Sequence, residues 1–201
     1  MNDELAWVAQ AQQGSDEAFT RLVESHQTHV YNLCSRMLGE PEAAEDAAQE
    51  TFLRAYQNLH RYDSSRSFVT WLLSIAAHYC IDRLRRKKLS VFSMDEERED
   101  GTVFEIADPA SPDPEAESTK REERDRLHRL LGDLDETDRA AVIMRYWYDY
   151  SEIEIAESLQ LTVSAVKSRL HRSRRALAGM WQEEETLPAQ TERRRHESPA
   201  F

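Results

Sequence analysis

Hydrophobic residues recur at steps of three and four positions over most of this chain, which is the spacing of one face of an α-helix. Residues 16 to 38 carry such a stripe from Phe19 to Met37, and Ser15 precedes it as a suitable N-cap. A second helical pattern begins at Pro41 with an acidic first turn, as helix starts prefer. No segment stands out with the two-residue period of a strand, so the pattern predicts an all-α protein.

A third helical pattern follows a short polar loop, residues 61 to 67, and ends in five cations within residues 83 to 88. Its apolar stretch, FVTWLLSIAAHYCI, is interrupted by polar residues and is too short to cross a bilayer, so no membrane insertion is expected. Cys34 and Cys80 lie among apolar residues without metal-ligand spacing. We interpret them as reduced core thiols in a cytoplasmic protein, with a redox pair as the alternative.

Charge divides the chain into parts. The formal net charge is −12, yet residues 15–88 carry ten basic and ten acidic residues. Residues 89–119 carry ten acidic residues, one basic residue and three prolines without a sustained helical period, which is typical of a flexible linker. We therefore predict two small helical domains, residues 1–88 and 120–180, joined by an acidic linker, residues 89–119, and followed by a disordered tail, residues 181–201.

The stretch YSEIEIAESLQLTVSAVKSRLHRSRRAL, residues 150–177, has the pattern of two helices joined by a short turn. Ser151 and Glu154 form the capping box of the first helix, and Thr162 is a suitable N-cap for the second. Apolar residues lie on one side of the second helix, and residues 162–179 contain five basic residues and no acidic one. This predicts a helix-turn-helix whose second helix enters the major groove of DNA, with a solvated charged face as the alternative.

Two features of the first domain indicate partner surfaces. Leu53 falls among polar residues on one side of the second helix, which suggests a protein contact, although a lone exposed leucine is the simpler alternative. Aromatic residues interleave with arginines around the polar loop, a combination suited to unstacked bases. The alternative is that these rings belong to the core and that the basic helix end complements the helix dipole. The residues concerned are Tyr62, Phe68, Trp71, Tyr79, Arg61 and Arg66.

Two blocks of sequence resemble a known family. EDAAQETFLRAYQNLHRYDSSRSFVTWLLSIAAHYCIDRLRRKK and LGDLDETDRAAVIMRYWYDYSEIEIAESLQLTVSAVKSRLHRSRRAL are similar to bacterial extracytoplasmic-function (ECF) sigma factors of the two-domain type, and the likeness covers about residues 15–180. Three residues depart from the family pattern, because Gln160 and Asp149 stand where glycine is frequent and Asp135 where proline is common. Since a non-glycine residue at positive φ is strained, these positions bear on the geometry of the turns.

The resemblance implies three sites. The first docks on the clamp helices of core RNA polymerase, and its residues are Asp46, Gln49, Glu50, Leu53 and Arg54. The second captures a flipped base of the minus-ten element and holds the adjacent backbone, and its residues are Arg61, Tyr62, Asp63, Ser64, Ser65, Arg66, Trp71, Arg83, Arg85 and Arg86. The third reads the minus-thirty-five element, and its residues are Ser164, Lys167, Ser168, His171, Arg172 and Arg175, with Arg169 and Arg174 as phosphate contacts.

The resemblance further implies a sigma factor that binds core RNA polymerase and promoter DNA, opens the strands, serves a stress-response regulon and is held by an anti-sigma factor. The net negative charge predicts that the free protein binds duplex promoter poorly. No enzymatic activity, cofactor or metal is expected, because no nucleotide-binding loop or catalytic triad stands out and His26 lies on an apolar stripe without a second ligand. The alternatives are an autonomous helix-turn-helix regulator and a sigma-like interaction protein without initiation activity.

Overall fold

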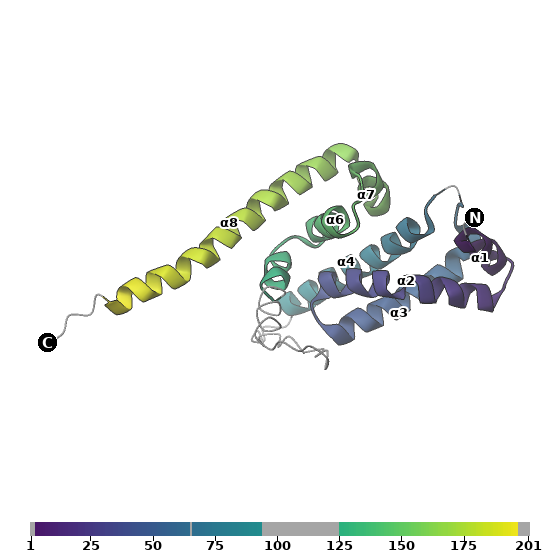
Figure 1. The fold of residues 1–201 in the computed structure, drawn as a ribbon, viewed down its shortest axis with the longest axis horizontal. Coiled ribbons are helices and arrows are strands. Elements are labelled where there is room, and N and C mark those ends of the chain that lie inside the picture. The colour runs from purple at the N-terminus through teal and green to yellow at the C-terminus, as the bar shows by residue number, and fades with distance from the viewer. Residues whose placement is uncertain (1–2, 65, 94–124, 197–201) are drawn as a thin grey trace.

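The computed structural model describes residues 3–64, 66–93 and 125–196, with side chains through residue 90 in the second range and residue 182 in the third. These residues form helices and turns, so the all-α prediction is confirmed (Figure 1). The N-terminal domain contains α1 (Asp3–Gln12), α2 (Asp16–Leu38), α3 (Pro41–Asn58), the 3-10 turn η1 (Leu59–Arg61) and α4 (Phe68–Ser93). No described helix is both long enough and apolar enough to cross a membrane.

The second helix begins and ends where its sequence indicates. Ser15 accepts a hydrogen bond from the N–H of Ala18 at 3.2 Å, and Gly39 ends α2 with a φ of 79°. The buried residues of α2 follow the predicted stripe, and they are Ala18, Leu22, His26, Val30, Leu33, Cys34 and Met37. Cys34 and Cys80 are both buried free thiols. The hydrophobic stripe therefore packs into the core of the N-terminal domain.

The buried histidine on this stripe contacts α1. Nε2 of His26 lies 2.9 Å from a carboxylate oxygen of Glu4, and its ring packs 5.5 Å from that of Phe68. Among the residues that the structure describes, no group of three or more histidine, cysteine, aspartate or glutamate side chains is placed to hold a metal ion. His26 thus ties α1 to the rest of the bundle.

The C-terminal domain begins with a helical segment over residues 125–132 and continues with α6 (Glu136–Trp147), α7 (Glu152–Leu159) and α8 (Val163–His196). Asp135, at the position where the family commonly has proline, is the N-cap of α6, because its carboxylate accepts from the N–H of Thr137 at 3.1 Å. Helices α7 and α8 pack together as the two helices of the predicted helix-turn-helix (Figure 1).

The two domains pack against each other. Helix α6 contacts α2 and α4 of the N-terminal domain, and α7 contacts α4. A helix that is buried on nearly every side belongs in the interior, and the buried residues of α6 are Glu136, Thr137, Arg139, Ala140, Ala141, Val142, Ile143 and Met144. The sequence predicts two domains joined by a flexible linker, and nothing in its pattern indicates this interface between them.

Two boundaries differ from the predicted ones. Helix α4 continues to Ser93, past the predicted domain end at residue 88, and the predicted tail begins inside α8, which continues to His196. Glutamine and glutamate, which follow Trp181 in the sequence, are strong helix formers and favour such an extension. The remainder of the acidic linker, residues 94–119, and the tail residues 197–201 lie outside the described residues.

Candidate nucleic-acid interface

The polar loop after α3 presents charged and hydroxyl side chains to solvent. The N–H of Tyr62 donates to the carbonyl of Leu59 at 3.1 Å, and the N–H of Arg66 donates to the carbonyl of Asp63 at 3.1 Å. These two bonds close consecutive turns. The exposed residues of this loop are Arg61, Asp63, Ser64, Arg66 and Ser67, while Ser65 lies outside the described residues.

Tyr62 is the exception, because its side chain is buried and only 5% exposed. Its ring centroid lies 5.0 Å from that of Trp71 and 5.5 Å from that of Phe68, and its hydroxyl donates to the carbonyl of Arg66. Burial, with smaller contributions from Glu4 and Asp63, raises the pKa of Tyr62 and keeps this donor protonated. The ring does not face solvent as a base-stacking surface would. Tyr62 therefore matches the alternative stated for the aromatic residues, that they belong to the core. Its role here is to tie the two ends of the loop together.

The cations at the end of α4 have partners within the protein. Arg83 lies 3.6 Å from the carboxylate of Asp46, so a predicted DNA contact and a predicted polymerase contact are neighbours across α3 and α4. Nε of Arg86 donates to the carbonyl of Asp82 at 3.2 Å. Both arginines remain at least partly exposed. An ion pair near the surface, such as that of Arg83, and an exposed side-chain bond to a backbone carbonyl, such as that of Arg86, stabilise the fold little, so both arginines could exchange these partners for DNA phosphates.

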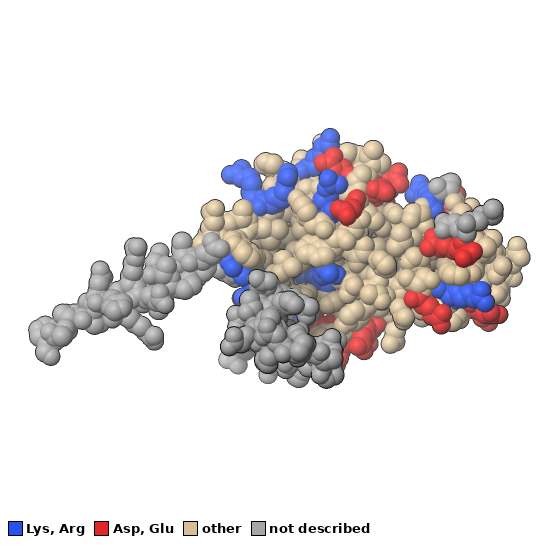
Figure 2. Space-filling model, in the orientation of Figure 1, with Lys and Arg blue, Asp and Glu red and all other residues tan. Residues whose placement is uncertain are grey.

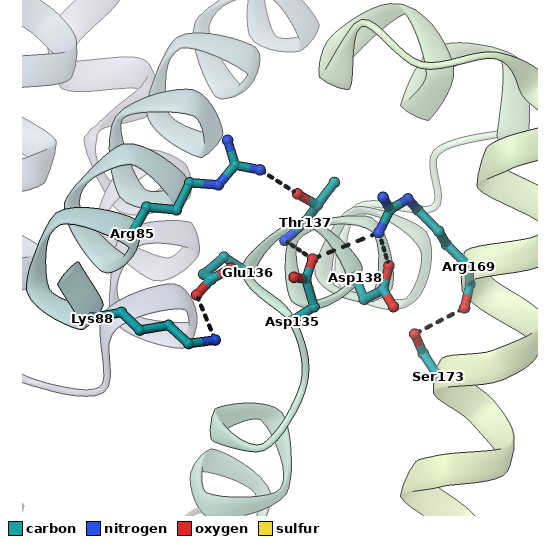
Figure 3. Close-up of polar contacts among 8 residues, drawn as sticks. All are labelled: Arg85, Lys88, Asp135, Glu136, Thr137, Asp138, Arg169 and Ser173. Carbon is teal, nitrogen blue, oxygen red and sulfur yellow. Dashed lines mark hydrogen bonds and ion pairs between the residues drawn. The ribbon is translucent and has the colours of Figure 1, made fainter. Parts of the chain in front are cut away.

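Two further α4 cations reach the C-terminal domain. Nη2 of Arg85 donates to the hydroxyl of Thr137 at 3.1 Å, and Nζ of Lys88 lies 3.9 Å from a carboxylate oxygen of Glu136 (Figure 3). Both partners belong to the first turn of α6, where the helix dipole favours acidic groups. The predicted backbone-binding end of α4 is therefore occupied in part by the other domain.

Arg169 approaches the same helix end from α8. Its guanidinium donates to the carboxylate of Asp138 and lies 3.6 Å from that of Asp135 (Figure 3). The carbonyl of Arg169 accepts from the hydroxyl of Ser173 at 2.9 Å. Arg169 thus connects α8 to α6, whereas the family resemblance implied that it contacts a DNA phosphate.

The outward face of α8 is polar and cationic, as Figure 2 shows. Its N-terminus is capped by Thr162, whose hydroxyl accepts from the N–H of Ala165 at 3.1 Å. Val166 and Leu170 are buried on the opposite face. The exposed polar residues are Ser164, Lys167, Ser168, His171, Arg172, Arg174 and Arg175. Helical periodicity therefore predicted correctly which α8 side chains face solvent, with Arg169 the partly buried member.

The turns before and within the helix-turn-helix have the strained backbone expected where another residue replaces the usual glycine. Gln160 and Asp149 have φ values of 55° and 53°, the left-handed region that glycine adopts most easily. The capping box is present, since Ser151 and Glu154 each accept a hydrogen bond from the other's backbone N–H. The hydrogen bonds from Ser151 lower the pKa of Glu154. Well-formed caps thus hold turns that these two residues strain.

Helix α3 exposes the predicted polymerase-facing residues. Leu53 is 51% exposed among polar neighbours, and Asp46 and Gln49 are also exposed. Arg54 pairs with Glu50 at 2.7 Å. A shallow apolar groove between α2 and α3 lies beside this face, and its lining includes Val23, Tyr31, Ala48, Gln49 and Phe52. The face has the apolar centre and polar rim of a protein-binding surface.

Two side chains that connect separate elements were not predicted from the sequence. Nε2 of Gln12 in α1 donates to the carbonyls of Leu59 and Tyr62, each at 3.0 Å. Arg139 in α6 donates to the carbonyls of Met37 and Gly132. The position of Arg139 directly before the apolar run AAVIM, residues 140–144, was a signal for it, whereas nothing in the pattern distinguishes Gln12 from its neighbours.

Two family models match the chain, Sigma-70 region 2 over residues 22–89 and Sigma-70 region 4 over residues 124–177. The ECF RNA polymerase sigma factor SigW of Bacillus subtilis (strain 168) is 37% identical over 175 residues, which cover 85% of this chain and 92% of that protein. The chain belongs to the ECF group of the sigma-70 family. This sigma factor is accordingly a non-enzymatic initiation factor that directs promoter recognition by RNA polymerase.

Other relatives agree with this assignment. The RNA polymerase sigma-H factor of Pseudomonas aeruginosa is 31% identical to this chain, and the match covers 85% of this chain and 89% of the Pseudomonas protein. The solved structure of CnrH in complex with the cytosolic domain of CnrY has a TM-score of 0.65 at 26% identity and covers 90% of this chain and 99% of that one. RpoE of Bartonella quintana, solved with the anti-sigma factor NepR, shares the fold with a TM-score of 0.64 at 18% identity, covering 82% and 96%. Helix α1 lies outside both matched segments.

Proposed function

We propose that the sigma factor docks on core RNA polymerase through α3, holds an unpaired minus-ten strand with the loop of residues 61–66, and reads minus-thirty-five duplex with α8. The observation that carries this proposal is the sorting of α8, whose cationic residues face solvent while Val166 and Leu170 are buried. An exposed polar face on the second helix of a helix-turn-helix is what entry into a major groove requires. Residues 1–88 and 120–180 then form the two working domains, with residues 89–119 as their tether.

Docking on the polymerase would use the α3 face. Leu53 would supply the apolar centre, and Asp46, Gln49, Glu50 and Arg54 the polar surroundings. Leu53 is about half exposed in the free protein, so covering its remaining apolar surface on binding would be favourable by about 1 kcal/mol. The exposed position of Leu53 supports this role.

Strand opening would proceed by trapping. Separating stacked base pairs costs about 1.4 kcal/mol per step, and a base held by side chains returns about 1 to 3 kcal/mol. One small domain therefore biases opening but does not drive it alone, and the polymerase cleft would add backbone contacts. Since Tyr62 is in the core, the exposed loop residues, Arg61, Asp63, Ser64 and Arg66, would hold the base, with Arg83, Arg85 and Arg86 on the backbone beside it.

The interface between the domains bears on this mechanism. Arg85 hydrogen-bonds Thr137 across the interface, so binding a phosphate would mean exchanging that partner. Binding two promoter elements that lie roughly 50 Å apart, between one and two turns of duplex, would also move the domains relative to each other. The predicted linker is residues 89–119, and α4 takes up its first residues to Ser93, so the remaining residues, 94–119, would reach at most about 90 Å when extended. We infer that the free protein binds duplex promoter poorly and becomes selective in the holoenzyme.

Regulation would resemble that of the structural relatives. CnrH was solved with the cytosolic domain of CnrY, and RpoE with the anti-sigma factor NepR. An anti-sigma factor that binds this chain in the cytoplasm and releases it under stress would fit the same plan. The α3 face is suited to such a partner, because covering Leu53 would also block the polymerase.

Transcription by purified core RNA polymerase from a randomised promoter library tests the proposal. The sigma factor is expected to select templates that share two short elements at fixed spacing. Selection of a palindrome by the free protein would instead identify an autonomous helix-turn-helix regulator. Binding to core polymerase without transcripts would identify a sigma-like interaction protein.

A further inference from the structure

We propose that Gln12 of α1 is a positioning residue for the strand-capture loop, and this inference rests on the proposed role of residues 61–66 in holding the minus-ten strand. Gln12 lies before the segment that matches the sigma-70 region 2 model, which begins at residue 22. Its side chain nevertheless contacts the backbone at the start of that loop. The amide acts on DNA only through the loop.

The contact is specific in its geometry. Nε2 of Gln12 is 3.0 Å from the carbonyl oxygen of Leu59 and 3.0 Å from that of Tyr62. An amide nitrogen carries two N–H donors, so one group satisfies both carbonyls. The last carbonyls of a helix lack an intrahelical partner, and those of Leu59 and Tyr62 stand where α3 gives way to η1 and the loop. The Leu59 carbonyl accepts from the N–H of Tyr62 as well as from Gln12, so it has two donors.

The rest of the loop is held from the other side. The N–H of Tyr62 donates to the Leu59 carbonyl at 3.1 Å, and the Tyr62 hydroxyl donates to the carbonyl of Arg66. Gln12 therefore fixes the turn from Leu59 to Tyr62, and the hydroxyl of Tyr62 in turn holds the backbone at Arg66. Losing its amide would let that turn widen and shift the exposed side chains that follow it.

Helix α1 is itself anchored, which makes it a suitable support. Val8 and Ala11 are buried, and Glu4 pairs with the buried His26 of α2 at 2.9 Å. A donor mounted on a fixed helix holds its acceptor better than one on a mobile chain, because the backbone that carries it is already ordered and loses no further entropy when the contact forms. Loop geometry would thus depend on a helix remote from the DNA.

The test compares Gln12→Leu, which keeps the size and removes both donors, with Gln13→Leu, whose side chain is exposed at the neighbouring position. Holoenzymes are assembled with the full-length chains. Each is assayed on a promoter selected by the wild-type holoenzyme from a random library, both as closed duplex and with the minus-ten region premelted by mismatches. Binding to a single-stranded oligonucleotide of the minus-ten element, affinity for core polymerase and the thermal midpoint are measured alongside.

Gln12→Leu is expected to weaken oligonucleotide binding and duplex opening by about fivefold to tenfold, which is the effect of one or two hydrogen bonds. Core affinity and dependence on the minus-thirty-five element stay at wild-type values, and the premelted template restores most of the transcription. The inference is overturned if Gln12→Leu behaves like Gln13→Leu, or if core affinity and thermal midpoint fall in step with opening, since the role is then structural.

Arg66→Ala separates this inference from the proposed function. If Arg66→Ala impairs opening and Gln12→Leu does not, the loop holds DNA without help from α1. If neither variant impairs opening, the proposed role of the loop itself is wrong.

Discussion

The guanidinium of Arg139, in the C-terminal domain, donates to the main-chain carbonyl of Met37, in the N-terminal domain, at 2.5 Å. The same group donates to the carbonyl of Gly132 at 2.7 Å. Burial lowers the pKa of Arg139, while Glu136, Asp133 and Asp135 oppose that shift. A charged side chain therefore caps the C-terminal end of α2, where the helix dipole favours a cation, and joins the two domains.

Arg139→Met is expected to lower the free energy of unfolding by about 2 to 3 kcal/mol, because the buried carbonyl of Met37 and the part-buried carbonyl of Gly132 both lose a charged donor. Urea denaturation followed by circular dichroism measures the change. Arg175→Met, an exposed arginine on α8, serves as the control and should unfold like the wild type. Equal stability of the two variants would show that the domains do not pack through Arg139 in solution.

Substitutions of two arginines on α8 are expected to have different effects, one on DNA binding and the other on stability. Arg172 is exposed, so Arg172→Ala should reduce transcription that depends on the minus-thirty-five element by about tenfold without changing the thermal midpoint. Arg169 is paired with Asp135 and Asp138, so Arg169→Ala should lower the thermal midpoint. Transcription assays and thermal melts on the same preparations measure both effects. If the Arg169→Ala protein is as stable as the wild type but binds DNA weakly, Arg169 contacts DNA and does not stabilise the fold.

Leu53→Asp is expected to weaken binding to core RNA polymerase by at least about tenfold, because a charge would replace the apolar centre of the α3 face. Leu5 of α1 offers a matched control, since the two leucines are 50% and 51% exposed. Leu5→Asp should bind core normally. Affinity measured by fluorescence anisotropy with labelled sigma factor decides the question, and equal losses in the two variants would argue against a docking face on α3.

Mild acid is expected to destabilise the packing around His128. Burial is the main cause that lowers the pKa of His128 below 6.5, Arg36 and Arg139 lower it further, and Asp125 opposes them. The unfolded chain then binds more protons than the folded one, so stability falls as the pH drops through 6.5 toward the lower folded pKa. Urea midpoints at pH 7.5 and 5.5 measure this loss.

A histidine variant isolates that effect from the other groups that titrate over the same range. His128→Asn should lose less stability between the two pH values than the wild type, whereas His60→Asn, at an exposed position, should lose as much. If His128→Asn and the wild type lose the same amount, His128 is not buried in the folded protein.

Local patterns accounted for much of the fold. The stripe of α2, the N-cap at Ser15, the capping box of Ser151 and Glu154, and the two faces of α8 follow from residue spacing alone, because each involves neighbours within one or two helical turns. The departures at Gln160 and Asp149 marked the two non-glycine residues with positive φ among those described. Family membership likewise rests on ordered blocks of sequence.

Contacts between distant elements depended on the tertiary structure. Tyr62 faces the core rather than solvent, Arg169 pairs with α6, and Gln12 and Arg139 bond to carbonyls that belong to other helices. An aromatic ring serves a core or a base equally well, and a backbone carbonyl is the same group at every residue. Neither side-chain type nor spacing therefore reveals which partner the fold brings within hydrogen-bonding distance, and that is decided only when the helices pack.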